Sequence, residues 1–131
     1  MSPRNSIGTI GVDIVEIKRL RRVSKKWGKG FLKKVYTARE LAYAKSRRFP
    51  YQHLAARFAA KEAIFKALGD VEKDFVGWKN IEIVNDAYGR PLVQWHGAAL
   101  RTKNKRGIKE ALVSLSHTEN YAVATAMLVY K

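Results

Sequence analysis

The stretch that decides the fold is YQHLAARFAAKEAIFKAL, residues Tyr51 to Leu68, and it has the composition of a long helix. Pro50 stands directly before it and Gly69 directly after it. Proline is favoured at the first position of a helix and glycine just past the last, so both ends carry the expected signals. We therefore predict that the longest helix of the chain lies between these two residues.

The side chains of this helix separate onto stripes when each residue turns by about 100°. Leu54, Phe58 and Phe65 fall on a stripe that should face the core. Glu62 and Lys66 fall on the adjoining stripe, among alanines that let another backbone or a ligand come close. The same two residues also fit an ordinary surface ion pair between positions i and i+4, which is common. Spacing alone does not decide between a functional pair and a surface pair.

Upstream of this helix, the sequence predicts a strand, a basic segment and a short helix. Residues Ile7 to Ile17 alternate as a strand does. Lys18 to Lys34 holds nine Lys or Arg and no acid, and we expect a helix that is broken by a turn at WGKG, residues 27–30. TARE at 37–40 is a capping-box pattern, which predicts a helix running to about Ser46.

Downstream of the long helix, the predicted elements are mostly strands. Residues 78–85 and 91–95 predict a strand pair around a turn, and residues 98–105 a short basic helix. Residues 111–117 and 121–130 predict a second strand pair. This order predicts one domain over residues 1–131 with an α+β fold, in which an antiparallel sheet packs on the long helix.

The composition indicates a globular chain with acidic or phosphorylated partners. Lys and Arg number 26 and Asp and Glu 11, a formal net charge of +15, which attracts polyanions without choosing among them. Cysteine is absent, which excludes disulfides and thiolate metal sites. No apolar run approaches the roughly 20 residues of a membrane span, and residues 1–6 lack the order of a signal peptide. We therefore expect a cytoplasmic protein.

Three positions have side chains suited to chemistry. Asp13 lies in an apolar strand, where a lone carboxylate is costly to bury unless it is paired or bound to a metal; Gly11, on the same face, leaves room beside it. An aspartate that faces solvent from an edge strand fits equally well. His117, beside two serines at a strand end, suits phosphate binding or proton transfer, and Arg90 in its turn suits a phosphate contact. Both residues also fit ordinary turns.

Three sequence blocks together resemble the holo-acyl-carrier-protein synthase family of 4'-phosphopantetheinyl transferases. The blocks are GVDI at 11–14, RFAAKEA at 57–63 with Lys66, and SLSH at 114–117. They stand in the order of the family and at about its spacing, so the resemblance extends from Ile7 to Val129. The FAAKEA block is the most specific element, and the GRP turn at 89–91 also resembles the family. The resemblance implies a 4'-phosphopantetheinyl transferase-like fold.

The resemblance implies an enzyme that transfers the 4'-phosphopantetheine group of coenzyme A to a serine of apo-acyl carrier protein. Adenosine 3',5'-bisphosphate is released, and the product supports fatty-acid or polyketide biosynthesis. Asp13 and Glu62 would hold Mg²⁺ against the coenzyme A pyrophosphate, which suits a hard cation with oxygen ligands. Glu62 and Lys66 would be catalytic, with Lys66 steadying the reacting phosphate. Either Glu62 or a metal-bound water would accept the serine proton.

The resemblance also implies contacts with both substrates. The residues expected to contact coenzyme A are Arg57, Lys61, Lys66, Arg90 and His117. The residues expected to dock the acidic carrier protein are Arg19, Arg22 and Lys26, where opposite charge would speed encounter and fix orientation. The family implies a homotrimer with sites at the subunit interfaces, so that groups such as Arg90 or His117 could come from a neighbour.

Three alternatives remain open in the sequence. The charge also fits a small nucleic-acid-binding protein, although the aromatic residues form no stacking motif of the RNA-recognition type; we therefore expect neither a nucleic acid nor a membrane as partner. A transferase-like protein that only binds is disfavoured by the presence of Asp13, Glu62 and Lys66. A carrier protein of peptide or polyketide synthesis could replace the fatty-acid carrier. The basic cluster from Arg101 to Lys109 belongs to none of the motifs.

Overall fold

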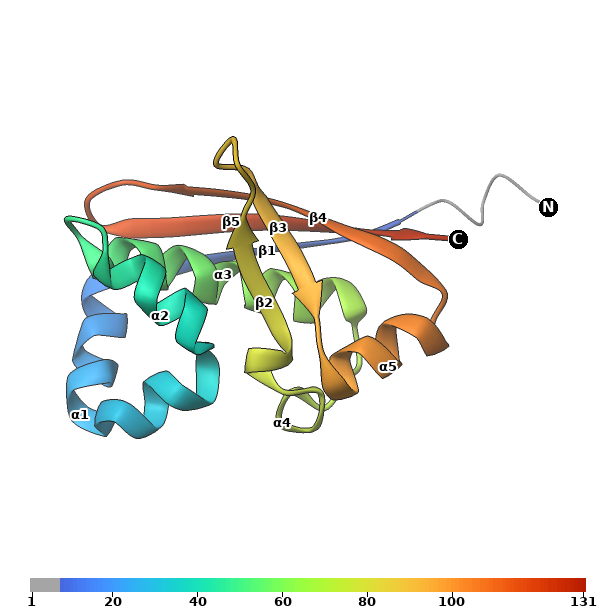
Figure 1. Cartoon of the computed structure of the whole chain (residues 1–131), viewed down its shortest axis with the longest axis horizontal. Coiled ribbons are helices and arrows are strands. Elements are labelled where there is room, and N and C mark those ends of the chain that lie inside the picture. The colour runs from blue at the N-terminus through green and yellow to red at the C-terminus, as the bar shows by residue number, and fades with distance from the viewer. Residues whose placement is uncertain (1–7) are drawn as a thin grey trace.

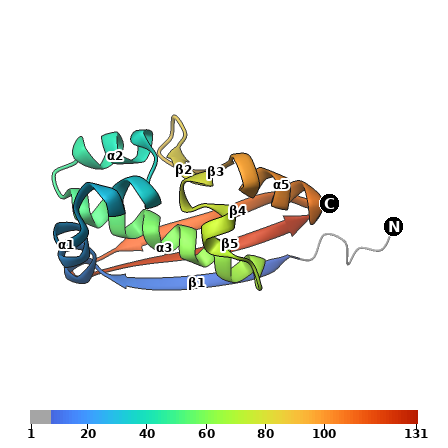
Figure 2. The same cartoon turned by 90° about the horizontal axis from the view of Figure 1, so that it is seen from below.

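Helix α3 (Pro50–Leu68) packs on one face of a three-stranded antiparallel sheet, and this pair forms the framework of the structure (Figures 1 and 2). The structure is a computed structural model that describes residues 8–131. Strand β5 (Tyr121–Tyr130) lies between β1 (Thr9–Glu16) and β4 (Ile108–His117). The predicted α+β class, with an antiparallel sheet on a long helix, is confirmed.

Most of the remaining elements lie on the side of α3 that faces away from the sheet, as Figure 2 shows for α2 and the hairpin of β2 and β3. These elements are α1 (Ile17–Val35), α2 (Ala38–Lys45), α4 (Lys73–Val76), the 3₁₀ helix η2 (Trp78–Asn80), β2 (Ile81–Asn85), β3 (Pro91–Trp95) and α5 (Gly97–Lys105). The hairpin forms a separate two-stranded sheet. Residues 78–80, which we expected to begin a strand, are helical instead, and α4 was not predicted.

Strand β1 approaches α3 closely because Gly11 has no side chain. A Cβ atom built at Gly11 would lie 1.9 Å from the carbonyl oxygen of Ala63. Asp13 lies on this inner face of β1, as the alternation of the strand predicts. The outer face therefore carries the large apolar side chains of the strand, which are 70%, 55% and 65% exposed at Ile10, Val12 and Ile14.

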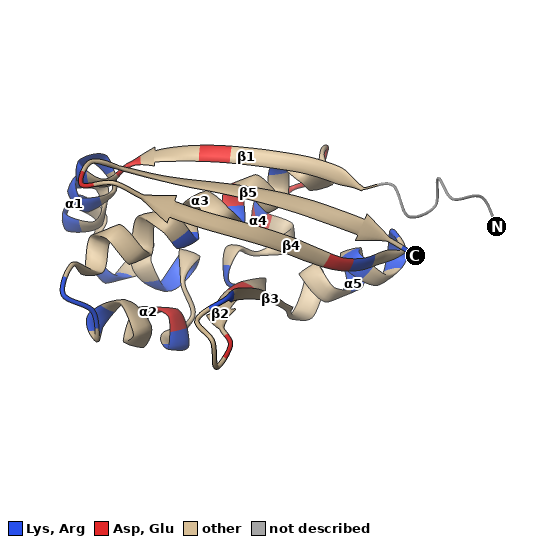
Figure 3. Cartoon of the chain, turned by 90° about the horizontal axis from the view of Figure 1, so that it is seen from above, with Lys and Arg blue, Asp and Glu red and all other residues tan. Residues whose placement is uncertain are grey.

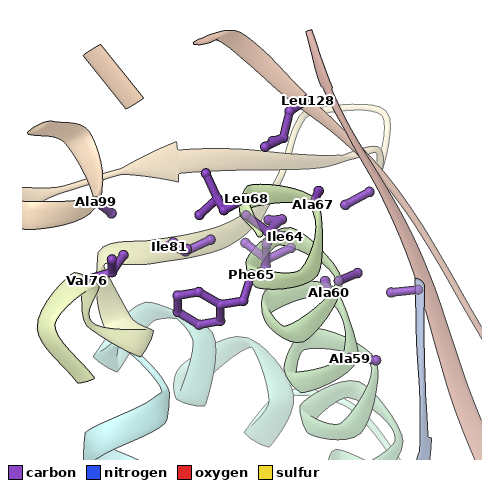
Figure 4. Close-up of a cluster of buried hydrophobic side chains, with 14 of the residues drawn as sticks. Ala59, Ala60, Ile64, Phe65, Ala67, Leu68, Val76, Ile81, Ala99 and Leu128 are labelled. Carbon is purple, nitrogen blue, oxygen red and sulfur yellow. The ribbon is translucent and has the colours of Figure 1, made fainter. Parts of the chain in front are cut away.

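Helix α3 is buried around most of its circumference, because it lies between the sheet and the second layer. Its side chains form the centre of the larger apolar cluster, together with Ile81 of β2 and Leu128 of β5 (Figure 4). The predicted core residues Leu54 and Phe65 are buried, whereas Phe58 is half-buried. No helix within residues 8–131 is long and apolar enough to span a bilayer.

Helix α1 is kinked at Gly28, whose backbone has φ 63° and ψ −148°. A positive φ is strained for other residues, so glycine allows the change of direction here. The turn that we expected over residues 27–30 is shorter in the structure. Only Gly28 is non-helical, and the helix resumes after it and continues to Val35. The two helical pieces together carry the basic segment that follows β1.

Candidate active site

Asp13 and Lys66 meet where β1 packs on α3. The Lys66 Nζ atom donates to Asp13 Oδ1 at 3.0 Å and to the carbonyl oxygen of Val12 at 3.0 Å. The side chain of Asp13 is 18% exposed and that of Lys66 is 54% exposed. The carboxylate therefore lies at the margin of the core, paired with a cation that links the helix to the strand.

Glu62 lies one turn before Lys66 on α3 but pairs with a different lysine. Its Oε2 atom accepts a hydrogen bond from the Nζ atom of Lys73 in α4 at 2.9 Å. Because Lys66 reaches across to Asp13 instead, the interpretation of Glu62 and Lys66 as a surface i,i+4 pair is wrong. Lys73 was not identified from the sequence, since its position depends on how α4 folds back toward α3.

Asp13 and Glu62 line one groove of about 570 Å³. Arg19 of α1 lines the same groove, and most of the remaining wall is apolar, including Phe31 and Phe58. The structure thus brings together two residues expected to hold a metal and one expected to dock the carrier protein. A groove with a polar end and an apolar wall suits a ligand with a charged group and a longer, less polar arm.

The carboxylates of Asp13 and Glu62 fit Mg²⁺ as part of a larger ligand set. Within residues 8–131, no group of three or more His, Cys, Asp or Glu side chains lies close enough to hold a metal ion. Zinc sites usually need three or four protein ligands with nitrogen or sulfur donors. Mg²⁺ usually keeps several waters and binds through one or two carboxylates plus substrate phosphates. Two carboxylates at an open groove meet that requirement.

Arg57 lies in a second cavity, also of about 570 Å³, that shares no lining residue with the first. Its Nη2 atom donates to Asn85 Oδ1 at 2.5 Å, and its guanidinium lies 4.1 Å from the ring centre of Tyr43. Its Nε atom is buried without a partner, and burial lowers the pKa of the guanidinium. Arg39 and Arg47 line the same cavity. No sequence motif marked them; Arg39 lies on α2 and Arg47 just after it.

His117 lies near the end of β4, against a second histidine. The rings of His117 and His53 meet edge to face, with centres 5.7 Å apart, and His53 makes a similar contact with Tyr43. The pKa of His53 is lowered from its ordinary value, first by burial and then by the charge of Arg57. The two histidines thus connect to the Arg57 cavity through Tyr43. No sequence motif marked His53, which lies within the predicted long helix.

Lys61 does not lie at either cavity, and this corrects the expectation that it contacts a coenzyme phosphate. Its side chain is fully buried, and its Nζ atom donates to Glu40 Oε1 at 2.9 Å and to the carbonyl oxygens of Trp78 and Ile81. Burial lowers the pKa of Lys61, an effect that Glu40 opposes. Glu40 also closes the predicted capping box with Thr37. Lys61 therefore joins α3 to α2 and β2.

Arg90 lines a different groove from Arg57. It follows the turn between β2 and β3, where its backbone N–H donates to Asp86 Oδ1 at 2.9 Å. Its side chain lines a different groove, beside Lys103 and Lys109. The expected turn is confirmed, and its residues Asp86 and Gly89 line the Arg57 cavity. Arg90 itself lines neither that cavity nor the groove of Asp13.

The candidate docking residues lie on α1, where Lys and Arg gather (Figure 3). Arg19 faces the groove of Asp13 and Glu62. Arg22 lies 3.5 Å from Glu16, and Lys26 lies over the ring of Trp27. All three cations are exposed, so a partner could reach them together with the groove.

The chain is similar in sequence and fold to a known family of proteins. A family model described as the 4'-phosphopantetheinyl transferase superfamily matches residues 9–126. The holo-[acyl-carrier-protein] synthase of Syntrophus aciditrophicus is 45% identical over 118 residues, which cover 90% of this chain and 92% of that protein. The protein of the same name from Desulforudis audaxviator is 45% identical over 122 residues, which cover 92% and 91% of the two chains.

Solved structures of the family superimpose closely on this fold. The holo-[acyl-carrier-protein] synthase of Neisseria meningitidis matches with a TM-score of 0.84 and 36% identity, over 92% of this chain and 96% of that chain. A complex of a Chronobacterium ammoniagenes synthase with CoA matches with a TM-score of 0.83 and 34% identity, over 95% and 98%. The sequence blocks, the fold and these similarities agree, and the chain belongs to the 4'-phosphopantetheinyl transferase superfamily, among the holo-[acyl-carrier-protein] synthases.

Proposed function

We propose that this chain transfers the 4'-phosphopantetheine group of coenzyme A to a serine of apo-acyl carrier protein, with Mg²⁺ held by Asp13 and Glu62. The observation that carries the proposal is the meeting of these two carboxylates and Arg19 at one groove. A family relative is named for this reaction and another was crystallised with CoA. The product, holo-acyl carrier protein, supports fatty-acid or polyketide synthesis in the cytoplasm.

The reaction moves one phosphoryl centre between two oxygens. The serine hydroxyl oxygen bonds to the phosphorus that bears the pantetheine, and the bond to the bridging oxygen breaks, releasing adenosine 3',5'-bisphosphate. When bound, Mg²⁺ supplies charge neutralisation on the pyrophosphate oxygens. Lys66, half exposed beside Asp13, can turn from the carboxylate to the reacting phosphate and stabilise its developing charge. Either Glu62 or a water beside it accepts the hydroxyl proton.

The remaining phosphates of coenzyme A need cations that the first groove does not supply. Arg57, Arg39 and Arg47 offer them at the second cavity, and Arg90 offers one at the hairpin. His117 lies beside His53, which contacts Tyr43 of the second cavity. Because these groups line different cavities of one chain, we propose that a neighbouring subunit brings its Arg57, Arg90 or His117 to the groove of Asp13.

The outer face of the three-stranded sheet supports a homotrimer. Its exposed residues are mostly apolar and align across the strands, with Ile10 and Leu112 both opposite Met127. These three side chains are 70%, 50% and 43% exposed. A contiguous apolar face on a soluble domain usually marks an interface. A second and third copy of the chain would cover this face.

The proposed activity predicts a defined mass change in a carrier protein. Apo-acyl carrier protein, incubated with this protein, coenzyme A and Mg²⁺, should gain the mass of one phosphopantetheine group in an intact-mass measurement. Excess EDTA should block the gain, and added Mg²⁺ should restore it. A gain that is unaffected by EDTA would contradict the metal assignment, and no gain would contradict the activity.

A further inference from the structure

Lys73 contacts Glu62 directly but has no role in the phosphopantetheine transfer proposed for this chain. Its Nζ atom lies 2.9 Å from Glu62 Oε2 and faces the rings of Phe65 and Trp78, with ring centres at 5.9 and 5.7 Å. Trp78 is stacked on Phe58, with a centre distance of 5.2 Å. The aromatic rings favour a cation at this place. Lys73 is therefore an ammonium group held beside Glu62, although Lys73 itself does not line the groove.

The two carboxylates at the groove each have a lysine partner. Asp13 pairs with Lys66 at 3.0 Å, and Glu62 pairs with Lys73 at 2.9 Å. Two negative and two positive groups leave the metal-free cluster with no net charge. A dication bound alone would raise the cluster to a net charge of +2, whereas the two negative charges of a pyrophosphate diester would return it to zero. The charge count therefore favours metal binding together with the substrate.

We propose that Lys73 is a positioning residue, the resident counter-ion of Glu62 that a divalent cation must displace. Its ammonium weakens metal binding in the absence of coenzyme A, and its release makes a cation available to the substrate phosphates. The side chain of Lys73 is 45% exposed, so it has solvent into which it can turn when displaced. This inference rests on the proposed assignment of Asp13 and Glu62 as metal ligands.

A neighbouring ion pair offers a matched control. Lys34 lies 3.3 Å from Asp74, which is also on α4, and both side chains are mostly exposed. Lys34 is on α1, and Lys34→Met removes one lysine charge from an ion pair with α4 while it leaves Glu62 paired with Lys73. Lys73→Arg keeps the charge. Thermal unfolding of these variants, of Glu62→Gln and of the unchanged protein is measured in EDTA and during titration with Mn²⁺, without coenzyme A and at one protein concentration.

In EDTA, Lys73→Met should unfold about 1–4 °C lower than Lys34→Met, because Glu62 loses its partner. Mn²⁺ should raise the unfolding midpoint of Lys73→Met at about two- to fivefold lower concentration than it does for the unchanged protein. Lys34→Met and Lys73→Arg should respond as the unchanged protein does. Glu62→Gln should show no Mn²⁺ response.

The outcomes separate the two claims. If Glu62→Gln abolishes the response while Lys73→Met responds at the same Mn²⁺ concentration as the unchanged protein, Lys73 is not the displaced counter-ion and the metal site stands. If Glu62→Gln keeps the full response, the metal assignment itself fails. If neither the unchanged protein nor Lys73→Met unfolds at a higher temperature in Mn²⁺, the proposed displacement of Lys73 by a metal ion is wrong.

Discussion

Lys61 and Glu62 are adjacent in the sequence but have opposite surroundings. The roughly 100° turn between consecutive helical residues points Lys61 into the layer formed by α2 and β2, and Glu62 toward the groove beside β1. A buried ammonium needs several partners, and Lys61 has three, including the buried carboxylate of Glu40. In the FAAKEA block, Lys61 thus stabilises the fold, whereas Glu62 lines the groove.

Lys61→Met should lower the free energy of unfolding by about 3–5 kcal/mol, because it leaves Glu40 buried without a cation. Urea unfolding measures this change. The double variant with Glu40→Gln should recover part of the loss, since removing both charges of a buried pair costs less than removing one. A single variant as stable as the unchanged protein would show that the pair does not stabilise the fold.

Among single residues, Asp13, Glu62 and Lys66 were identified from the sequence through motif blocks. The structure places all three at one margin of the core. The sequence could not show that Lys61 is buried while Glu62 lines the groove. Helical periodicity assigns one buried face, whereas α3 is buried on nearly all sides. The sequence also missed Lys73, whose contact with Glu62 spans 11 residues and a short unpredicted helix. Contacts made by folding back carry no local periodic signal.

Strand β1 and helix α3 are the elements that set the spacing of the carboxylates. Asp13 comes from the strand and Glu62 from the helix, so the distance between the two backbones sets the spacing of the proposed metal ligands. Gly11 allows that distance, since a Cβ atom there would overlap the backbone of Ala63. The close packing of β1 on α3 therefore determines how near the carboxylates of Asp13 and Glu62 lie to each other.

Gly11→Ala should slow transfer by about 10- to 100-fold, because a shift of about 1 Å in reacting groups has effects of that size. It should also lower the free energy of unfolding by about 1–3 kcal/mol through overpacking. Gly30→Ala is the control: its added methyl group meets no atom within 4 Å, and an alanine in this helix should be neutral or slightly stabilising. Equal activities in steady-state assays of the two variants would contradict this role of Gly11.

Helix α1 is the expected docking element for the acidic carrier protein. Arg19→Ala should raise the KM for carrier protein about three- to tenfold, with little change in the KM for coenzyme A, because opposite charges mainly guide encounter and orientation. Arg101→Ala removes the same charge on α5 and should change neither value. If both variants weaken carrier-protein binding equally, the carrier protein is attracted by the net charge of the protein and not by a docking surface on α1.

The elements were largely predictable from local signals, and the exceptions have physical causes. The capping box at α2 and the limits of α3 follow from residue preferences at helix ends, and both are confirmed. The glycines at 28 and 30 predicted a turn, but only Gly28 leaves the helical conformation. The separation of β2 and β3 from the main sheet depends on backbone pairing between distant strands, which alternation does not encode.

At the scale of the whole molecule, residues 8–131 leave one face of the three-stranded sheet uncovered. α3 covers the inner face of the sheet, and the outer face presents Ile10, Val12 and Ile14 to solvent. Alternation predicted two faces of β1 but not which one would pack on α3; the glycine on the inner face decides that. A trimer would bury the outer face and bring the separate cation groups of neighbouring chains toward each groove.

Val12→Glu should dissociate the proposed trimer, because a charge in an apolar interface is costly to bury. Light scattering after gel filtration should then give the mass of one chain, and transfer should be lost because the site is incomplete. Phe75→Glu adds the same charge at an exposed residue of α4, away from the sheet, and should leave the assembly unchanged. A trimer that persists in Val12→Glu would contradict this interface.

Whether Glu62 carries the metal-dependent transfer can be measured directly by the intact mass of apo-acyl carrier protein. Glu62→Gln should transfer phosphopantetheine at least about 100-fold more slowly while keeping its fold by circular dichroism, since the isosteric amide cannot replace a metal-binding carboxylate. Glu72→Gln, an exposed glutamate nearby, should transfer at the unchanged rate. A folded Glu62→Gln variant that is as active as Glu72→Gln would show that Glu62 does not hold the metal or carry the transfer.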